Sequence, residues 1–321
     1  MTSADSDAWH VPVLAQEALE ALLVDPKGLY VDLTAGGGGH SSLILEKLES
    51  GGRLLAADRD GEAIIESEKR LAAVKTKGTY QVIQATFSDF PHWLAADDRG
   101  SVKGLMADLG VSSRQFDRGE RGFSYLHDGP LDMRMNMESG QSAAELLAGI
   151  SQTGLAALLR LYGEERYAAS IAAAIVARRR KEPITRTLEL AEIVASAVPA
   201  RERREGNPAR KTFQAIRMAV NQEQEELAHL LDVIPPVMAQ GGRLALISFH
   251  SLEDRMIKQT MRRWQNPCQC PRDFPACICG KKPLGRQWPP KPISPSAEEI
   301  LRNPRARSAR MRVFEFKGDQ V

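Results

Sequence analysis

The chain has 321 residues, 43% of them hydrophobic and 26% charged, and its net charge is only +2. This composition is ordinary for a soluble globular protein, and the near-neutral balance means that any nucleic-acid contact must come from local basic patches. No run of about 18 apolar residues is present and the polar segment Met1–Trp9 lacks the features of a signal peptide, so we expect a cytoplasmic protein that enters no membrane.

The first 110 residues alternate strand-like and helix-like segments. Four strands are predicted, at Leu29–Leu33, Arg53–Ala57, Tyr80–Gln84 and Val102–Leu109, the first of them buried. Strands separated by helical segments form βαβ units, so a parallel sheet with right-handed crossovers is expected.

This alternation stops after the fourth strand. Residues 118–137 have the composition of a loop, residues 141–199 favour helices, and Thr212–Leu231 is predicted to form one long helix. Strands return at Arg243–Phe249 and Met311–Phe316.

The simplest organisation is a single α/β domain with an insert. We predict a doubly wound, Rossmann-like sheet built from residues 1–117 and 216–321, interrupted after strand four by a helical substrate-recognition domain at 118–215.

A glycine run, Gly36–Gly39, follows the first strand, and Asp58 follows the second, 20 residues after Gly38. Glycines there allow the backbone to approach a ligand closely, and a carboxylate after the second strand can bind ribose hydroxyls. Together they predict an adenosine-containing cofactor; a glycine-rich turn without a ligand is the less favoured interpretation.

Two cofactors are compatible with an adenosine site. A dinucleotide usually requires G-x-G-x-x-G to hold its pyrophosphate, and here Ser41 replaces the third glycine. S-adenosylmethionine has no phosphate and carries a cationic sulfonium, which suits an acid beside the loop such as Asp32. The terminal strand also fits methyltransferase sheets, in which a late strand often inserts antiparallel. S-adenosylmethionine is therefore the predicted cofactor.

Motifs along nearly the whole chain then suggest a family. In order they are HVPVL at His10–Leu14, GGGGH at Gly36–His40, DRD at Asp58–Asp60, DLGVSS at Asp108–Ser113, ERGFS at Glu120–Ser124, DGPLDMR at Asp128–Arg134, YGEER at Tyr162–Arg166, TFQA at Thr212–Ala215, ISFHSLEDR at Ile247–Arg255 and NPRAR at Asn303–Arg307. The chain thereby resembles the bacterial family of small-subunit (16S) ribosomal RNA cytidine N4-methyltransferases, known as RsmH or MraW.

The resemblance implies a reaction and a set of site residues. The reaction would be methyl transfer from S-adenosyl-L-methionine to the exocyclic N4 amine of a cytidine in 16S ribosomal RNA within the small ribosomal subunit. The oligomeric state, monomer or homodimer, stays open. The implied cofactor contacts are Gly38, Gly39, His40, Asp58, Phe87, Asp108 and Gln115.

Asp108, at the end of the fourth strand, is the candidate catalytic residue. An exocyclic cytosine amine is a poor nucleophile, so an acceptor for its N–H would localise its lone pair and take up developing charge. Many amino-directed methyltransferases place Asn or Asp before Pro-Pro and an aromatic residue here, whereas this chain continues Leu-Gly-Val-Ser-Ser. Direct catalysis and cofactor binding alone are both open for Asp108.

Residues near the fifth strand extend the candidate site. His250 could bind the base or a phosphate, or be structural. Phe123 and Phe249 could stack on an extruded base, although core packing is the commoner role of a phenylalanine.

Basic residues gather in two regions. One comprises Arg178–Lys181, Arg201–Arg204 and Arg210–Lys211, and the other runs from Arg302 to Arg312. Taken singly, each cluster favours a solvated surface; together they support an RNA-facing side.

The four cysteines are Cys268, Cys270, Cys277 and Cys279, and their confinement to one segment argues against a disulfide scaffold. Four thiolates could bind zinc, but C-x-C pairs are less typical than C-x-x-C. We expect no metal, with a loop of reduced cysteines as the favoured interpretation.

Two alternatives to the methyltransferase stay open. A nicotinamide-dependent oxidoreductase is disfavoured by the missing third glycine, and a non-catalytic RNA-binding assembly factor would bind RNA without transferring a methyl group.

Overall fold

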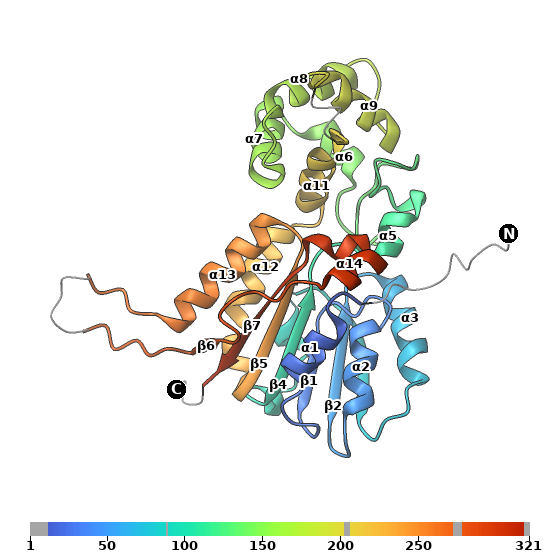
Figure 1. Cartoon of the computed structure of the whole chain (residues 1–321). Coiled ribbons are helices and arrows are strands. Elements are labelled where there is room, and N and C mark those ends of the chain that lie inside the picture. The colour runs from blue at the N-terminus through green and yellow to red at the C-terminus, as the bar shows by residue number, and fades with distance from the viewer. Residues whose placement is uncertain (1–11, 88, 202–205, 272–277, 318–321) are drawn as a thin grey trace. The chain divides into compact units, whose positions relative to one another are not determined.

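The computed structural model describes residues 12–87, 89–201, 206–271 and 278–317, which form two compact units (Figure 1). The α/β unit contains the described residues of His10–Gly110 and Glu225–Val321, and the insert unit contains those of Val111–Gln224. The insert is therefore wider than the predicted 118–215, because Val111, Phe116 and Val220 all pack against its hydrophobic core.

The sheet of the α/β unit has seven strands in the described part of the chain, in the order β3-β2-β1-β4-β5-β7-β6. The strands are β1 (Leu29–Asp32), β2 (Arg53–Asp58), β3 (Thr79–Gln84), β4 (Val102–Asp108), β5 (Met238–Ser248), β6 (Gly285–Gln287) and β7 (Arg310–Phe316). The strands β1 to β5 are parallel to one another, and β7 pairs antiparallel with both β5 and β6. This confirms the doubly wound methyltransferase-type sheet and its antiparallel late strand.

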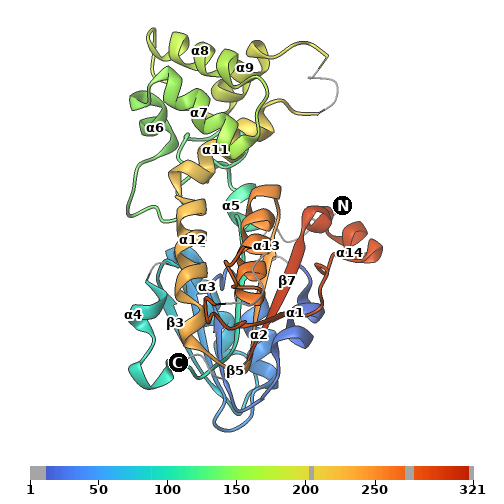
Figure 2. The same cartoon turned by 90° about the vertical axis from the view of Figure 1, so that its left-hand side faces the viewer.

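Helices cover both faces of this sheet. One face carries α1 (Ala15–Leu22), α2 (Gly39–Lys47) and α3 (Gly61–Ala72), and the other carries α4 (Phe90–Trp93), α12 (Glu223–Val233) and α13 (Ser251–Gln265). Figure 2 shows α1 and α12 on opposite sides of the strands. A short helix, α14 (Ala297–Arg302), precedes β7.

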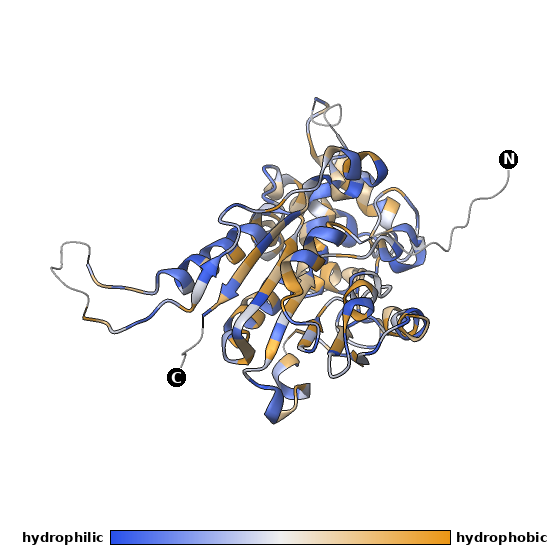
Figure 3. Cartoon of the chain, turned by 60° about the horizontal axis from the view of Figure 1, so that its bottom comes forward, coloured by the Kyte–Doolittle hydropathy of each residue, from blue (hydrophilic) through white to orange (hydrophobic). Residues whose placement is uncertain are grey.

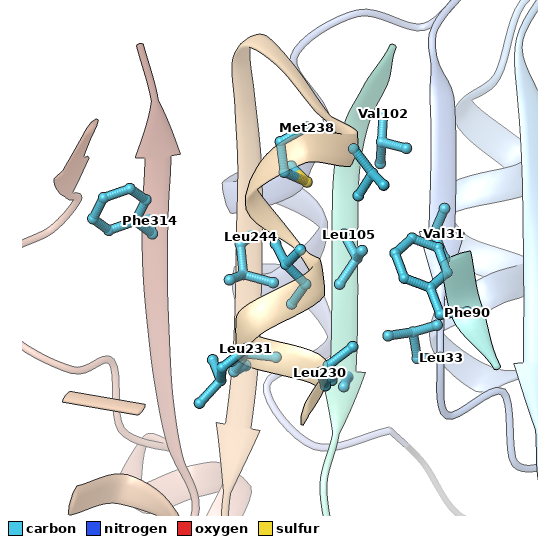
Figure 4. Close-up of a cluster of buried hydrophobic side chains, with 14 of the residues drawn as sticks. Val31, Leu33, Phe90, Val102, Leu105, Leu230, Leu231, Met238, Leu244 and Phe314 are labelled. Carbon is cyan, nitrogen blue, oxygen red and sulfur yellow. The ribbon is translucent and has the colours of Figure 1, made fainter. Parts of the chain in front are cut away.

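The two cores follow from the alternation of side chains along each strand. Leu105 packs on the α12 face, whereas its neighbour Met106 packs on the α1 face, because successive strand residues point to opposite sides. Both faces are buried, so the central strands are almost continuously apolar, as their hydropathy colouring shows (Figure 3). Figure 4 shows the α12 face, where Phe90, Leu230 and Leu231 pack near the strands.

The insert unit is helical, as predicted. The α-helices among its described residues are α5 (Ser113–Asp117), α6 (Ala143–Gly149), α7 (Gln152–Gly163), α8 (Ala168–Arg179), α9 (Thr187–Ala197) and α11 (Ala209–Val220). Ser142 and Ser151 cap α6 and α7 by accepting backbone N–H groups, which explains where these helices begin.

The prediction of one helix over Thr212–Leu231 is wrong. The helix divides into α11 and α12 because Gln222 adopts a left-handed conformation (φ 51°). The side-chain amide of Asn221 donates to the carbonyls of Met133 and Arg217, at 2.7 and 2.9 Å, and so fixes the chain at this break.

Among the described residues, no helix has the length and apolar character needed to cross a membrane.

Candidate functional site

Three carboxylates meet at one edge of the sheet because the strands that carry them are parallel. Asp32 ends β1, Asp58 ends β2 and Asp108 ends β4, and β1 lies between the other two strands. Asp32 pairs with Ala56 and Met106, so Asp58 and Asp108 each lie two residues farther along their strands. Ligands of open α/β sheets bind at this carboxyl edge. The sequence-predicted positions of Asp58 and Asp108 at strand ends are therefore confirmed.

The glycine run forms a tight loop between β1 and α2. Gly36 and Gly38 have φ values of 52° and 75°, a region that other residues rarely adopt. The Gly36 N–H donates to Asp58 Oδ2 at 2.8 Å, and the Ser67 hydroxyl donates to the Gly36 carbonyl at 2.8 Å. The loop is thus held in place by β2 and α3.

Ser41, which stands where a dinucleotide site has its third glycine, has a definite structural role. Its hydroxyl donates to Asp32 Oδ2 at 2.6 Å, and Asp32 Oδ1 accepts the Thr34 N–H at 3.0 Å. Asp32 is fully buried, and burial raises its pKa. Asp32 therefore organises the loop through these hydrogen bonds. Its negative charge also raises the pKa of Asp58 and of Asp108.

His40 follows the glycines in the first turn of α2 and is buried. Its Nε2 lies 2.9 Å from the Val13 carbonyl, so this nitrogen carries the proton and donates it. Burial lowers the pKa of His40, which keeps the ring neutral. Whether His40 contacts a cofactor stays a prediction.

Asp58 links the loop to the start of α3. Besides Gly36, it accepts the Asp60 N–H at 2.9 Å on Oδ1. Burial raises the pKa of Asp58 to about 6 in spite of these two bonds, and the charges of Asp60 and Asp32 add to the shift. Each carboxylate oxygen retains a second lone pair that a hydroxyl group could use.

Asp108 differs from the other two carboxylates in that one of its side-chain oxygens has no hydrogen-bond partner among the described residues. Its backbone N–H donates to Thr34 Oγ1 at 2.6 Å, but Oδ1 is buried and accepts no hydrogen bond within the described residues. Burial raises the pKa of Asp108 well above its usual range, and the negative charges of Asp32 and Glu253 raise it further.

The charge of the three carboxylates and the Asp108 Oδ1 atom, unpaired among the described residues, indicate which cofactor the site fits. A buried carboxylate oxygen without a donor is costly unless a ligand supplies a hydrogen bond or a positive charge. The sulfonium and amine of S-adenosylmethionine would supply both, whereas a pyrophosphate would add negative charge beside Asp32, Asp58 and Asp108. The residues present therefore fit S-adenosylmethionine and oppose a dinucleotide.

Glu253, in the first turn of α13, is a buried carboxylate that sequence reasoning did not single out. Its Oε2 accepts the Phe249 N–H at 3.1 Å, and its Oε1 lies 3.1 Å from His250 Nε2. Glu253 thus fixes the turn between β5 and α13. In the sequence it looks like an ordinary acid at a helix N-terminus, so only the fold reveals this contact.

The aromatic candidates have different surroundings. Phe123 is 4% exposed and belongs to the insert core, which agrees with core packing, the commoner of the two roles considered for it. Phe249 and Phe87 are partly buried at the edges of the two cores of the α/β unit. Phe87 lies in the turn after β3, and its predicted adenine contact is untested.

Gln115 lies in the insert unit and forms a capping box at the start of α5. Its side-chain oxygen accepts the Ser112 N–H at 3.0 Å, and its own N–H donates to Ser112 Oγ at 3.2 Å. The S-x-x-Q pattern could have revealed this helix start from the sequence. The predicted cofactor contact of Gln115 stays a prediction.

The basic clusters are only partly available for phosphates. Arg178 pairs with Glu182 and Glu189, and Arg179 donates to the Leu147 carbonyl. Arg312 is buried and pairs with Asp254 at 2.6 Å, so its inclusion in an RNA-facing group is wrong.

Within the predicted basic clusters, the described residues that are exposed are Arg180, Lys181, Arg201, Arg210, Lys211, Arg302, Arg305, Arg307 and Arg310. Residues 202–205, which include most of the predicted Arg201–Arg204 cluster, lie outside the described residues, as do His10 and Val11 of the first motif.

Comparison with known proteins identifies the family. A family model described as the MraW methylase family matches residues 7–317. A ribosomal RNA small subunit methyltransferase H from Symbiobacterium thermophilum is 48% identical over 94% of this chain and 95% of its own length. The proteins of the same name from Carboxydothermus hydrogenoformans and Trichlorobacter lovleyi are 46% and 45% identical, over 95% and 96% of this chain and 97% and 98% of their own lengths. The chain therefore belongs to the MraW methylase family.

Proposed function

We propose that this protein transfers a methyl group from S-adenosylmethionine to the exocyclic N4 amine of a cytidine in 16S ribosomal RNA of the small subunit. The observation that carries the proposal is the Asp108 carboxylate, which ends β4 beside the glycine loop and whose buried Oδ1 accepts no hydrogen bond within the described residues. The names of the relatives, which are ribosomal RNA small subunit methyltransferases, support the substrate class.

The cofactor would be held by the loop and the three strand-end carboxylates. We assign the ribose hydroxyls to Asp58 and the positively charged part of the cofactor to the field of Asp32 and Asp108. When bound, S-adenosylmethionine supplies a methyl group on a positively charged sulfur that an amine can attack.

We assign the handling of the amine to Asp108. Its Oδ1 would accept an N–H of the cytosine amine, which orients the nitrogen and localises its lone pair. When the nitrogen gains the methyl group, it must lose a proton, and a carboxylate whose pKa is raised is the better acceptor for it. Glu253 would act as a positioning residue by holding Phe249 and His250 beside this site.

The substrate must present a base that has left its stack, because the site cannot reach an amine inside a helix. A structured ribosomal particle would provide such a base and remote phosphate contacts, so free cytidine should react poorly. The insert unit, with its exposed basic residues, is the part of the chain to which we assign RNA recognition.

The direct test is nucleoside mass spectrometry of 16S ribosomal RNA from cells that lack this protein. We expect N4-methylcytidine to disappear and to return with the wild-type chain or with the exposed-site control Asp97→Ala, but not with Asp108→Ala. Restoration by Asp108→Ala would remove the assigned role of Asp108. An unchanged nucleoside profile would favour a non-catalytic assembly factor.

The same experiment distinguishes amine methylation from ring methylation. Methylation at C5 of cytosine usually requires a cysteine nucleophile, and all cysteines of this chain lie between Cys268 and Cys279, after α13. The appearance of 5-methylcytidine as the missing nucleoside would overturn the proposed reaction.

A further inference from the structure

The cysteines of the segment between α13 and β6 are outside the proposed methyl-transfer site, but they gather in space. The sulfur atoms of Cys268, Cys270 and Cys279 all lie within 4.8 Å of one another. Cys268 and Cys270 belong to the outgoing part of this segment and Cys279 to the returning part. The fourth cysteine, Cys277, lies outside the described residues.

The segment, which we call the cysteine arm, comprises the described residues 266–271 and 278–284 (Figure 1). At its base, the Leu284 N–H donates to the Trp264 carbonyl at 2.8 Å. Farther along, the Lys281 ammonium donates to Gln269 Oε1 at 2.7 Å and connects the two sides.

No described residue of the cysteine arm is fully buried, and Ile278 is 75% exposed. Burial of apolar surface therefore cannot hold the two sides of the arm together. Short segments without a core of their own generally depend on a cross-link such as a disulfide or a metal ion. The convergence of three sulfur atoms in such a segment indicates where the cross-link lies.

We propose that Cys268, Cys270 and Cys279 bind a zinc ion as thiolates and that this ion holds the cysteine arm closed. In a tetrahedral site with Zn–S bonds of about 2.3 Å, the sulfur atoms are roughly 3.8 Å apart, which agrees with the observed clustering. Thiolates are soft ligands that select zinc over magnesium or calcium. The expectation of no metal, drawn from the unusual C-x-C spacing, is thereby replaced.

The neighbouring charges are compatible with such a site. Three thiolates and one Zn²⁺ carry a net negative charge, and Lys281 and Lys282 follow Cys279 after a single glycine. Binding releases the thiol protons and joins the two sides of the arm, so the metal would stabilise the folded arm without taking part in methyl transfer.

The test measures metal content and metal spectra of the full-length protein, purified under reducing conditions without chelator. We expect stoichiometric zinc by elemental analysis and, after exchange with Co²⁺, the thiolate-to-cobalt charge-transfer bands of a tetrahedral site. Cys270→Ser should weaken Zn²⁺ binding by at least about 100-fold, because loss even of groups that only orient ligands costs about 10- to 100-fold. The control Lys282→Gln changes the same arm without removing a sulfur and should bind zinc normally.

Three outcomes would overturn the proposal. They are a wild-type chain that takes up no stoichiometric zinc or cobalt, a Cys270→Ser variant that binds zinc like the wild type, and mass spectrometry that finds the arm's cysteines paired as disulfides under those conditions. None of these measurements depends on methyl transfer. A negative result would therefore overturn the zinc site and leave the proposed function unaffected.

Discussion

At the scale of single residues, the candidate site gathers three strand-end carboxylates whose desolvation disfavours their charged forms. Asp32, Asp58 and Asp108 all have raised pKa values, with burial as the largest cause. A raised carboxyl pKa means that the folded protein binds a proton more tightly than the unfolded chain. The stability that such a group contributes is therefore fully present below its unfolded pKa of 3.8 and is lost as the pH rises through its folded pKa.

Because stability falls as the pH rises for a carboxyl group of raised pKa, we can predict the pH dependence of the stability of Asp108→Asn. The variant removes a desolvated carboxyl group that can become negatively charged, so the wild type should lose more stability than the variant as the pH rises from 4 to 8. At the upper end we expect the variant to be more stable by on the order of 1–3 kcal/mol. Urea denaturation across this pH range measures the difference. The exposed control Asp97→Asn should follow the wild type, and a less stable Asp108→Asn would contradict the assignment.

The pKa of Asp58 predicts how cofactor affinity depends on pH. Because this pKa is about 6, the carboxylate that would accept the ribose hydroxyls is increasingly protonated below that pH. Calorimetry should therefore show weaker S-adenosylmethionine binding at pH 5 than at pH 8. Asp58→Ala should weaken binding at pH 8 by about 1.5–3 kcal/mol, the usual contribution of hydrogen bonds to a charged group, and should reduce the pH dependence. An affinity that Asp58→Ala leaves unchanged would remove Asp58 from the site.

The residues of the site differ in how far the sequence could predict them. Asp58 and the glycines were predictable because their spacing after two strands is a local pattern. Ser41 was visible as a missing glycine, but its bond to Asp32 was not. Glu253 was not predictable at all, because its partners His250 and Phe249 resemble any turn before a helix until the turn is folded.

At the scale of elements, the sequence predicted the long, apolar strands and failed at positions where tertiary contacts decide. The strands β1, β2 and β4 are short, mostly apolar runs, and such runs are typical of buried strands of a parallel sheet. The strand β6 has three residues, Gly285–Gln287, with no apolar pattern, and it exists because β7 offers a free edge.

The break between α11 and α12 yields a prediction about Gln222. The sequence around it is compatible with a continuous helix, yet Gln222 is exposed and left-handed, a conformation that costs non-glycine residues about 1–2 kcal/mol. Gln222→Gly should therefore stabilise the protein by about 1 kcal/mol relative to Gln222→Ala, which keeps the Cβ atom responsible for the strain. Thermal unfolding of the two variants measures this, and equal stabilities would show that the break is not strained.

The exposed end of α8 provides a test of RNA recognition. Arg178 and Arg179 have partners within the insert, so a reversal of their charge would disturb folding. We expect the double variant Arg180→Glu, Lys181→Glu to weaken binding of small-subunit RNA. The slope of log affinity against log salt concentration should become shallower by roughly one for each phosphate that the variant no longer neutralises.

A matched control makes that experiment specific. Lys75 and Lys77 are also exposed, but they precede β3 at the edge of the sheet opposite the carboxyl ends. Their double reversal to Glu makes the same change in net charge and should leave RNA affinity nearly unchanged. If both double variants weaken binding equally, net charge alone governs affinity and the α8 terminus has no specific role.

At the scale of the whole molecule, the chain forms two units that each have their own hydrophobic core, and we assign the cofactor to one unit and the RNA to the other. The α/β unit is discontinuous in sequence, because the insert occupies the connection between β4 and β5. The sequence predicted this interruption from the change in pattern after strand four. It could not define the boundaries, because Val111 and Val220 belong to the insert only through packing across the unit.

The separation into two units predicts which segments should exchange their amide hydrogens more slowly when the cofactor binds. S-adenosylmethionine at 100 times its dissociation constant stabilises the folded site by about 2.7 kcal/mol. Hydrogen exchange followed by mass spectrometry should therefore slow in the glycine loop and at the end of β2, and not in α7 or α8 of the insert. The helix α5 is the informative segment, because added protection there would support the predicted contact of Gln115, which the capping box alone does not require. Protection spread through α7 and α8 would contradict the division, since it would mean that the cofactor also orders the unit to which we assign the RNA.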